Sequence, residues 1–375
     1  MSVETVAPLR RAVIEPLKAR FVDRDEVVDL IALAAVAGEH LFLYGPPGTA
    51  KSALIREFAR GVRGRYFEYM LTRFSEPNEI FGPIDVARLR EGTVVTVTTG
   101  MLPEAEFVFL DELFNANSAI LNNLLTVLNE RVYRRGAETH RLPLLSLFSA
   151  SNHLPEDDAL RALFDRFLLR CHVANLKREE MPQLLTAGWA LERETPWEST
   201  TTAGQLADLS AQIHDVDLSG VMTEYMDVVF KVRDLGIALS DRRSVKVMKL
   251  MAASALLCGR NAVQPSDLWV LRYVWDREEQ IEPLASLIQG VLKQQQDGTD
   301  SHPLSAVGAT ADAEELARKL ESVEQEVAAG NLKLGAIARV KEQLAVLADQ
   351  AAWVADADRK SYLRERVRKC LDRLG

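Results

Sequence analysis

The sequence has few cysteines and no long apolar run. Three cysteines, Cys171, Cys258 and Cys370, lie far apart and in no metal-ligand spacing. This pattern argues against a disulfide framework and a cysteine-rich metal site, and it predicts buried free thiols in a reducing cytoplasm. No apolar run approaches the roughly 20 residues that cross a bilayer, and residues 1–10 lack the apolar core of a leader. We therefore expect a cytoplasmic protein without a membrane span.

The chain also lacks an excess of positive charge. It carries 45 Lys and Arg against 54 Asp and Glu, for a net charge of −9. Nucleic acid is therefore an unlikely main partner, because neutralising phosphates needs a concentrated basic surface. A hydrophobic share of 47% is typical of an ordinary folded protein. At 375 residues the chain exceeds one compact core, so we expect two or three domains.

The most informative stretch is an apolar strand, residues 40–44, followed by a glycine-rich loop and a helix from residue 53. The loop consists of Gly45, Pro46, Pro47, Gly48, Thr49, Ala50, Lys51 and Ser52. Backbone amides of such a loop, with the positive end of the next helix, bind the phosphates of a nucleotide. Lys51 is expected to reach the terminal phosphates of ATP and Ser52 to ligate Mg²⁺. Ala50 stands where a third glycine is usual, and its methyl is compatible with helical dihedral angles unless the backbone there needs positive φ.

A second candidate group follows the apolar run 107–110, which reads as a strand buried on both faces. Asp111 can hold Mg²⁺ through its waters, and Glu112 can polarise a water that attacks the γ-phosphate. The alternative interpretation is an acidic turn after a strand. Because the run follows a phosphate loop, the pattern favours the catalytic interpretation.

Two further polar groups come later in the chain. Residues 144–152 read as a fourth buried strand that ends at Asn152, which could hydrogen-bond the attacking water, although a lone asparagine more often caps a loop. A short helix over 159–167 carries Arg161 and Arg166. An arginine supplied by a neighbouring subunit can stabilise a transferring phosphoryl group. The competing interpretation is a surface ion pair with Asp165.

Other segments predict the organisation around these motifs. Residues 78–99 read as an insertion with a short hairpin, because 93–99 combine β-forming residues between glycines. A helix over 118–129, capped by Ser118, precedes a hairpin over 132–142 with a basic tip.

The order of these motifs resembles the MoxR family of AAA+ ATPases, and it looks closest to the branch typified by regulatory ATPase variant A. The resemblance rests on short segments: 45–52, 71–75, 81–83, 102–106, 109–112, 119–122, 128–131, 150–152 and 165–167. It implies an α/β fold with an AAA+ P-loop core over residues 1–177, in which a parallel sheet lies between helices. A helix-2 insert and a hairpin before sensor 1 belong to this core.

The resemblance also assigns roles to single residues. Lys51 and Ser52 match the Walker A lysine and hydroxyl, and Asp111 and Glu112 match the Walker B pair. Asn152 matches sensor 1. Arg166 matches the arginine finger, with Arg161 as a second candidate.

The remaining chain would follow the core as an α-helical lid over 178–293. Asp241 stands where the family's Ser-Pro-Arg sensor 2 has proline, which leaves the register between Arg242 and Arg243 open; we prefer Arg242. Residues 294–311 have a linker composition, and we expect them to pack little. Three apolar seams predict a helical bundle or hairpin over 312–375.

The resemblance implies an ATP hydrolase that assembles into a ring, usually a hexamer, and remodels or matures protein clients. The family's typical partner is a protein with a von Willebrand factor A (vWA) domain. One alternative is a scaffold that binds ATP with little turnover, against which Glu112, Asn152 and Arg166 count. Another is a metal-chelatase motor subunit, and a nucleic-acid motor is the least favoured.

Overall fold

The computed structural model describes most of the chain. Its description covers residues 2–135, 138–155, 157–178, 180–191, 199–293, 301–306, 313–328, 357–373 and the single positions 340, 343, 344, 347 and 351.

A five-stranded parallel sheet forms the centre of the protein, with the order β2-β3-β6-β1-β7. Its strands are β1 (Leu41–Tyr44), β2 (Tyr66–Met70), β3 (Phe107–Asp111), β6 (Ser146–Ser151) and β7 (Leu169–His172). Every residue of β6 is buried, as are the first four of β3. Burial on both faces explains the continuous apolar sequence of β3, whereas in β6 the hydroxyls of Ser146 and Ser149 donate to the carbonyls of Glu39 and Leu110 (both 2.7 Å). The predicted α/β fold is confirmed.

The edge strand β7 is an element that the sequence did not predict. It begins at Leu169, which pairs with Leu41 of β1 in parallel register. Arg170 and His172 interrupt its apolar pattern, so no strand signal stands out over four residues. The strand forms because β1 offers a complete set of backbone partners.

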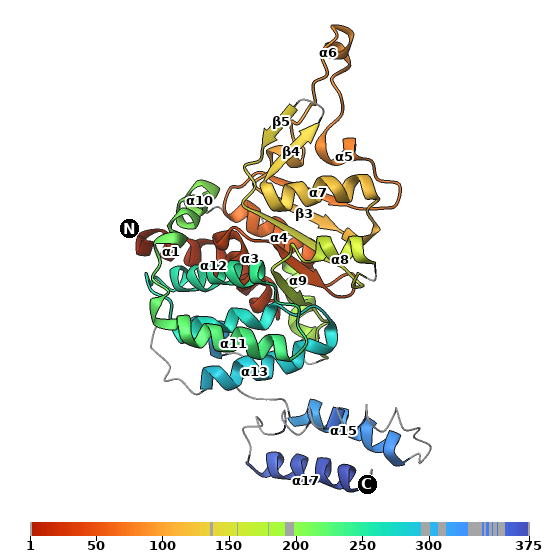
Figure 1. Ribbon diagram of the computed structural model, residues 1–375, viewed down its shortest axis with the longest axis vertical. Helices are drawn as coiled ribbons and strands as arrows, with labels where there is room; N and C mark the ends of the chain where they lie inside the picture. Colours follow the sequence, from red (N-terminus) through yellow and green to blue (C-terminus); the bar gives the residue numbers. More distant parts are fainter. Residues whose placement is uncertain are drawn as a thin grey trace.

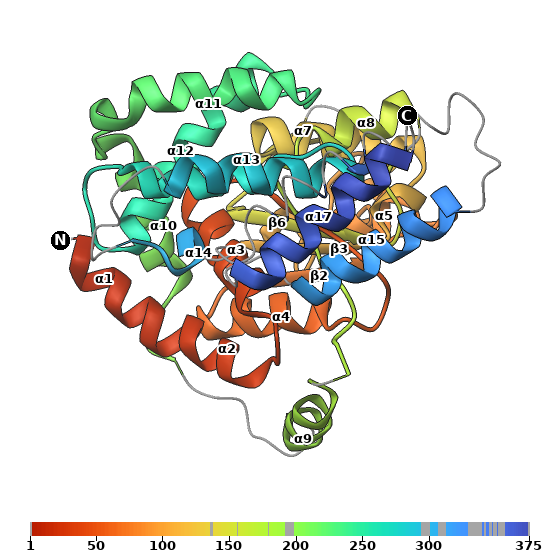
Figure 2. The ribbon, with the colours of Figure 1, turned by 90° about the horizontal axis from the view of Figure 1, so that it is seen from below.

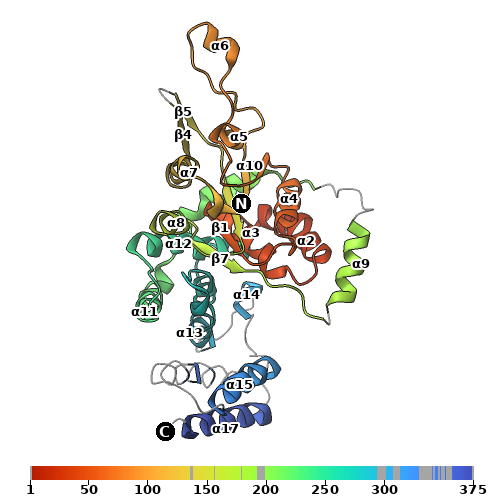
Figure 3. The same cartoon turned by 90° about the vertical axis from the view of Figure 1, so that its right-hand side faces the viewer.

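Helices cover both faces of the sheet. On one side lie α2 (Glu15–Arg20), α3 (Asp25–Ala37) and α4 (Lys51–Gly61), and on the other lie α7 (Ser118–Glu130) and α8 (Asp158–Phe164) (Figure 3). Before them, α1 (Ser2–Leu9) and a π-helical turn (Arg10–Ile14) lead into α2. The cap of α7 is Asn117 and not Ser118 as predicted: its Oδ1 accepts from the amides of Ala119 and Ile120, both at 3.1 Å.

The insertion forms a long arm that projects from the sheet (Figure 1). It contains α5 (Pro77–Phe81) and, at its tip, α6 (Val86–Arg90). Its stem is held by the Asp85 amide donating to the Val95 carbonyl (2.8 Å). The predicted short hairpin is present in minimal form: Ile84 and Thr96 form one antiparallel bridge, and the Val97 amide donates to the Pro83 carbonyl (2.9 Å). No strand of regular length forms over 93–99, because the arm offers this stretch no continuous partner strand. The predicted hairpin before β6 is confirmed by the antiparallel pair β4 (Val132–Arg135) and β5 (Glu138–Arg141); residues 136–137 at its tip lie outside the described part.

The segment after β7 is helical almost throughout, as predicted. Its helices are α9 (Met181–Leu191), α10 (Ala203–Ala211), α11 (Met222–Asp234), α12 (Asp241–Leu257) and α13 (Ile281–Lys293), with 3-10 helices over 212–215, 219–221, 265–273 and 278–280. Trp269 and Trp275 are fully buried among them.

One part of the predicted linker packs on the lid. In the segment that includes α14 (Pro303–Ala306), Leu304 is buried in the main core. The ring of His302 stacks on Trp269 with centroids 4.6 Å apart, and Arg272 Nη1 donates to the Leu304 carbonyl (2.9 Å). The expectation that this stretch packs little is therefore wrong for 301–306.

The C-terminal helices form a second, separate apolar cluster (Figure 1). Helices α15 (Ala313–Ala328) and α17 (Ala357–Arg373) pack together, and Arg366 Nε donates to Glu324 Oε1 across them (2.9 Å). The buried side chains of this cluster include members of all three predicted seams: Leu316, Leu320, Val323, Val327, Val340, Leu344, Leu347, Leu363 and Val367. Ile337 of the second seam lies outside the described residues. Across the described chain, no helix combines the length and apolar character that crossing a membrane requires.

Candidate nucleotide-binding site

The glycine-rich loop joins the end of β1 to the start of α4, as predicted. Its first residue, Gly45, donates its amide to the Ser151 carbonyl at the end of β6 (3.1 Å). A Cβ at Gly45 would lie 2.1 Å from the Val173 carbonyl oxygen, and φ is +154°. Only glycine fits this approach between the loop and the end of β7.

Ala50 adopts a left-handed conformation, with φ 65° and ψ 19°. Of the two conformations that the sequence left open, the backbone takes the one with positive φ, because the chain must turn at this residue to enter α4. A left-handed alanine costs about 1–2 kcal/mol relative to the right-handed form. No side chain caps α4, so the N–H groups of its first turn can donate to an anion bound at the loop.

Lys51, the first residue of α4, turns back over the loop. Its Nζ donates to the carbonyls of Gly45 (3.0 Å) and Pro46 (2.7 Å). Burial lowers the pKa of Lys51, and the negative charges of Asp111 and Glu112 oppose that shift. The two carboxylates therefore act on Lys51 electrostatically across this end of the sheet.

Arg24 is a residue near the site that sequence reasoning missed. It is buried just before α3, where its Nε donates to the Thr49 carbonyl (3.2 Å) and its Nη2 to the Ala174 carbonyl (3.0 Å). It therefore ties the loop to the segment after β7. The only sequence signal is a charged residue directly ahead of an apolar helix, which is too common to identify a site.

Asp111 ends β3, and Glu112 follows it in a left-handed conformation with φ 53° and ψ 48°. Asp111 Oδ1 accepts from the Glu112 amide (3.0 Å). A non-glycine residue held in this region costs about 1–3 kcal/mol, and such residues concentrate at functional sites. The turn brings Glu112 out of the strand line at the edge where β3 ends.

Asn152 directly follows β6, which lies between β1 and β3. Its side chain is exposed, and its Oδ1 lies 2.8 Å from His153 Nδ1. Because the strands are parallel, their carboxyl ends lie together along one edge of the sheet. This edge carries the loop after β1, the acids after β3 and Asn152 after β6. Ligands bind at this edge in open α/β sheets.

The polar groups at this edge suit a nucleoside triphosphate with Mg²⁺. Helix-terminal amides and Lys51 supply positive potential for phosphates. The Ser52 hydroxyl and the Asp111 carboxylate are hard oxygen ligands of the kind that Mg²⁺ takes together with water and phosphate. The residues present therefore fit the predicted pair of ATP and Mg²⁺.

Arg166 lies at the opposite end of the strands, where β1 and β7 begin. It comes between α8 and β7, and the Leu169 amide at the start of β7 donates to the His40 carbonyl that precedes β1 (3.3 Å). The four residues of β1 separate this end from the loop by about 13 Å. Arg166 Nη1 pairs with Asp165 Oδ2 (3.1 Å), so the predicted alternative of a local ion pair is present. Arg166 is not placed at the loop of its own chain.

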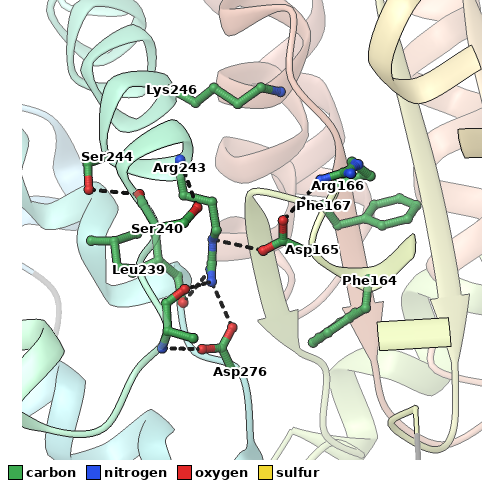
Figure 4. Close-up of polar contacts among 12 residues, drawn as sticks. Phe164, Asp165, Arg166, Phe167, Leu239, Ser240, Arg243, Ser244, Lys246 and Asp276 are labelled. Carbon is green, nitrogen blue, oxygen red and sulfur yellow. Dashed lines mark hydrogen bonds and ion pairs between the residues drawn. The ribbon is translucent and has the colours of Figure 1, made fainter. Parts of the chain in front are cut away.

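The two lid arginines occupy different environments. Arg242, our predicted sensor 2, is exposed at the start of α12, and its Nη2 donates to Asn129 Oδ1 near the end of α7 (2.7 Å). Arg243 is buried: its Nη1 donates to Asp276 Oδ1 (2.8 Å), and its Nε lies 3.9 Å from Asp165 Oδ1 (Figure 4). Arg243 therefore has a structural role, whereas Arg242 stays available at the surface. Both belong to the end of the sheet that carries Arg166.

Asp276 is the centre of this lid and core contact. Its Oδ1 accepts from both Arg243 and Arg170, a β7 residue that is 1% exposed. Its Oδ2 accepts from the Ala238 amide (2.7 Å). Burial alone would raise the pKa of Asp276, but the two guanidinium groups prevail and lower it. A carboxylate 33 residues from Arg243 and 106 from Arg170 thus joins the lid to the strand that follows Arg166.

Comparison with known proteins places this architecture in a family. A profile for the MoxR domain in the MoxR-vWA-beta-propeller ternary systems matches residues 8–211, and a profile for an AAA lid domain matches residues 221–288. The chain belongs to the MoxR family of AAA+ ATPases. The MoxR profile covers the whole sheet and both candidate edges, and the lid profile covers α11, α12 and most of α13.

Individual proteins are similar over most of the chain. An uncharacterized protein from Methanocaldococcus jannaschii is 37% identical over 277 residues, which cover 73% of this MoxR chain and 72% of the relative. Chaperone MoxR1 of Mycobacterium tuberculosis is 26% identical over 286 residues, 70% of this chain and 73% of that protein. A crystal structure of a proposed ATPase from Cytophaga hutchinsonii superposes with a TM-score of 0.63 at 17% identity, covering 79% of this chain and 96% of that chain. This last likeness concerns the fold.

Proposed function

We propose that this MoxR-family protein hydrolyses ATP within a ring, usually hexameric, and uses the resulting movement to remodel or mature protein partners in the cytoplasm. The observation that carries the proposal is the separation of the site into two halves. The loop, Asp111, Glu112 and Asn152 lie at one edge of the sheet, and Arg166 lies at the other. A complete site therefore needs two subunits.

In the proposed reaction, the loop amides and Lys51 bind the phosphates of ATP. Mg²⁺, when bound by Ser52 and Asp111, neutralises charge on the phosphate oxygens. Glu112 accepts the proton of the attacking water as the water oxygen bonds to the γ-phosphorus and the bond to ADP breaks, and Asn152 orients that water. Arg166 of the adjacent subunit stabilises the charge that develops on the transferring phosphoryl group. Arg242, exposed at the same edge as Arg166, is the proposed sensor 2 and acts on that same neighbouring site.

A vWA-domain protein is the proposed partner. The matching family is named for ternary systems of MoxR, vWA and β-propeller proteins, which supports a vWA partner and adds a β-propeller protein as a third component. MoxR1 is named as a chaperone, which supports protein remodelling. The matches describe MoxR proteins without singling out the regulatory ATPase variant A branch, so that assignment stays a prediction.

The decisive test mixes two variants that are inactive alone, Arg166→Ala and Lys51→Ala. If Arg166 acts on the neighbour, a mixed ring contains sites that combine an intact Lys51 with an intact Arg166, and hydrolysis returns. Fingers of this type contribute about 10³–10⁵ in turnover, so the recovered activity stands far above either variant. ATP hydrolysis is measured across mixing ratios, with light scattering to verify co-assembly. No recovery in a co-assembled ring would show that Arg166 has no role in trans.

A matched control separates the finger from its ion pair. Asp165→Asn removes the negative charge that pairs with Arg166 and keeps the shape of the Asp165 side chain. If the pair mattered only for stability, both Arg166→Ala and Asp165→Asn would cost about 0–1 kcal/mol and leave turnover near normal. A large loss of turnover for Arg166→Ala alone supports the proposed role.

A further inference from the structure

Helix α9 is an apolar element with most of its surface open. Its 11 residues, Met181–Leu191, contain no charged side chain. Four large apolar residues are exposed on it: Met181, Leu184, Leu185 and Trp189. Leu185 is 66% exposed and Trp189 63%. Their spacing of three and four residues places them along one side of the helix. Figure 2 and Figure 3 show α9 standing apart from the sheet and the other helices.

Such a helix needs a partner surface. Helices of about 12 residues or fewer are marginal in water, and α9 has no i,i+4 ion pair because it has no charges. At about 200 Å² for each large side chain, the four residues expose about 400 Å². A contiguous apolar patch of this size is typical of an interaction site.

The lid carries a second exposed apolar patch. It consists of Met226 and Phe230 on α11 and Val245 on α12, with Phe230 61% and Val245 64% exposed. The Tyr225 hydroxyl donates to the Ser244 carbonyl (2.5 Å) and holds the two helices together. Both views place α9 and α11 on opposite sides of the molecule (Figures 2 and 3). One chain therefore presents two apolar patches that cannot reach each other.

We infer that α9 of one subunit packs on the α11 and α12 patch, Met226, Phe230 and Val245, of the next copy of this chain. The inference rests on the proposed ring. α9 lies on the side of α2 and α4, and α11 lies on the side of α8, after which Arg166 follows (Figure 3). α9 follows β7, whose end lies beside the loop because the Val173 amide donates to the Tyr44 carbonyl (2.7 Å). α12 carries Arg243, whose Nε lies 3.9 Å from Asp165 Oδ1, next to Arg166. A contact between α9 and the lid patch thus joins the loop end of one subunit to the Arg166 end of the next, as the proposed ATP site does.

The geometry and the area agree with this partner. Two different patches in contact make a head-to-tail interface, which closes into a ring when its rotation closes. A standard interface buries about 800 Å² on each partner, so α9 supplies about half of one side. The remaining area belongs to the surfaces around the nucleotide. α9 therefore acts as an anchor beside the shared site, and it couples the lid of one subunit to the β7 end of the next.

Disulfide trapping in the full-length protein tests the contact. Leu185→Cys and Phe230→Cys are made singly and together, and assembly is induced with ATP and Mg²⁺. On oxidation, each single variant should stay at the wild-type background, an equimolar mixture should give covalent dimers, and the double variant should give a ladder of multimers. The wild-type protein sets the background because Cys258 is partly exposed. Non-reducing electrophoresis reads all five samples.

Four outcomes overturn the inference. Covalent dimers of Leu185→Cys alone would mean that α9 packs on another α9. A ring of normal size that gives no dimers in the mixture would mean that α9 faces a different partner, such as a client protein. Failure of any assembly with ATP overturns the inference together with the proposed ring. Recovery of hydrolysis in the Arg166 and Lys51 mixture without trapping overturns the α9 contact alone.

Charge substitutions give a second measurement that does not depend on oxidation. Leu185→Glu should weaken assembly about tenfold or more, because a carboxylate is buried against Phe230. Leu185→Glu combined with Phe230→Lys should recover assembly by pairing the charges across the contact. Tyr362→Glu on α17, where the tyrosine is 59% exposed, is the matched control and should assemble as wild type. Concentration-dependent light scattering measures each variant, and equal assembly of Leu185→Glu and Tyr362→Glu would refute the contact.

Discussion

Replacing Asp276 with asparagine should destabilise the protein strongly, because one carboxylate compensates two buried guanidinium groups. Arg170 and Arg243 are 1% and 2% exposed and both donate to Asp276 Oδ1. Removing one partner of a buried ion pair costs about 3–5 kcal/mol. Asparagine keeps an acceptor oxygen and the Asp276 side chain is 23% exposed, so we expect about 3 kcal/mol. At roughly 2–4 °C per kcal/mol, Tm should fall by about 6–12 °C.

The pH dependence follows from the same contacts. The pKa of Asp276 is lowered from its ordinary value of 3.8. The carboxylate therefore contributes its full stabilisation above about pH 4 and loses it as the pH falls through the lower value of the folded state. The difference in unfolding free energy between wild type and Asp276→Asn should be constant from pH 8 to about pH 5 and should shrink below pH 4.

The assay is chemical or thermal unfolding at several pH values, with ATP hydrolysis measured in parallel. Asp241→Asn is the control, because Asp241 also pairs with an arginine, Arg233 (2.8 Å), but its side chain is 98% exposed. It should unfold close to wild type. Asp276→Asn should also lower turnover, since Asp276 holds Arg243 near Asp165, the ion-pair partner of Arg166, which is the proposed arginine finger. A Tm for Asp276→Asn equal to that of Asp241→Asn would refute the reasoning.

Three further predictions concern the loop, the acids and the C-terminal helices. Glu112→Gln should keep ATP affinity while turnover collapses, and Lys51→Ala should lose ATP affinity itself. Isothermal titration measures the affinity and steady-state kinetics the turnover of both variants. Near-normal turnover of Glu112→Gln would remove Glu112 from the catalytic role. Ala50→Gly should leave Tm almost unchanged or slightly raised, because relief of about 1–2 kcal/mol of left-handed strain exceeds or balances about 0.4–1 kcal/mol of added chain entropy; a clear loss of Tm would contradict the backbone assignment. Deleting residues 307–375 should leave a folded ATPase. Deleting 295–375 should lower Tm, because the lid then loses the packing of Leu304 and of His302 on Trp269. Equal Tm values of the two truncations would show that 301–306 does not stabilise the lid.

The sequence determined the parts of this protein that depend on local pattern. The loop from Gly45 to Ser52, the buried strand before Asp111 and the hairpin over 132–142 follow from residue type and spacing within a few turns of chain. The same is true of the C-terminal seams, whose spacing of three and four residues predicts their buried faces. Such features need only the chemistry of neighbouring residues.

The tertiary structure decided the features that depend on partners far away in the chain. Strand β7 forms because β1 pairs with it, although Arg170 interrupts its apolar pattern. Ala50 is left-handed because the loop must turn between β1 and α4. Asp276 acquires its role only when the lid meets β7, and the choice between Arg242 and Arg243 depends on which of them that meeting buries. Long-range pairing and burial of charge leave no periodic signal in a single sequence, so these outcomes could be read only from the folded chain.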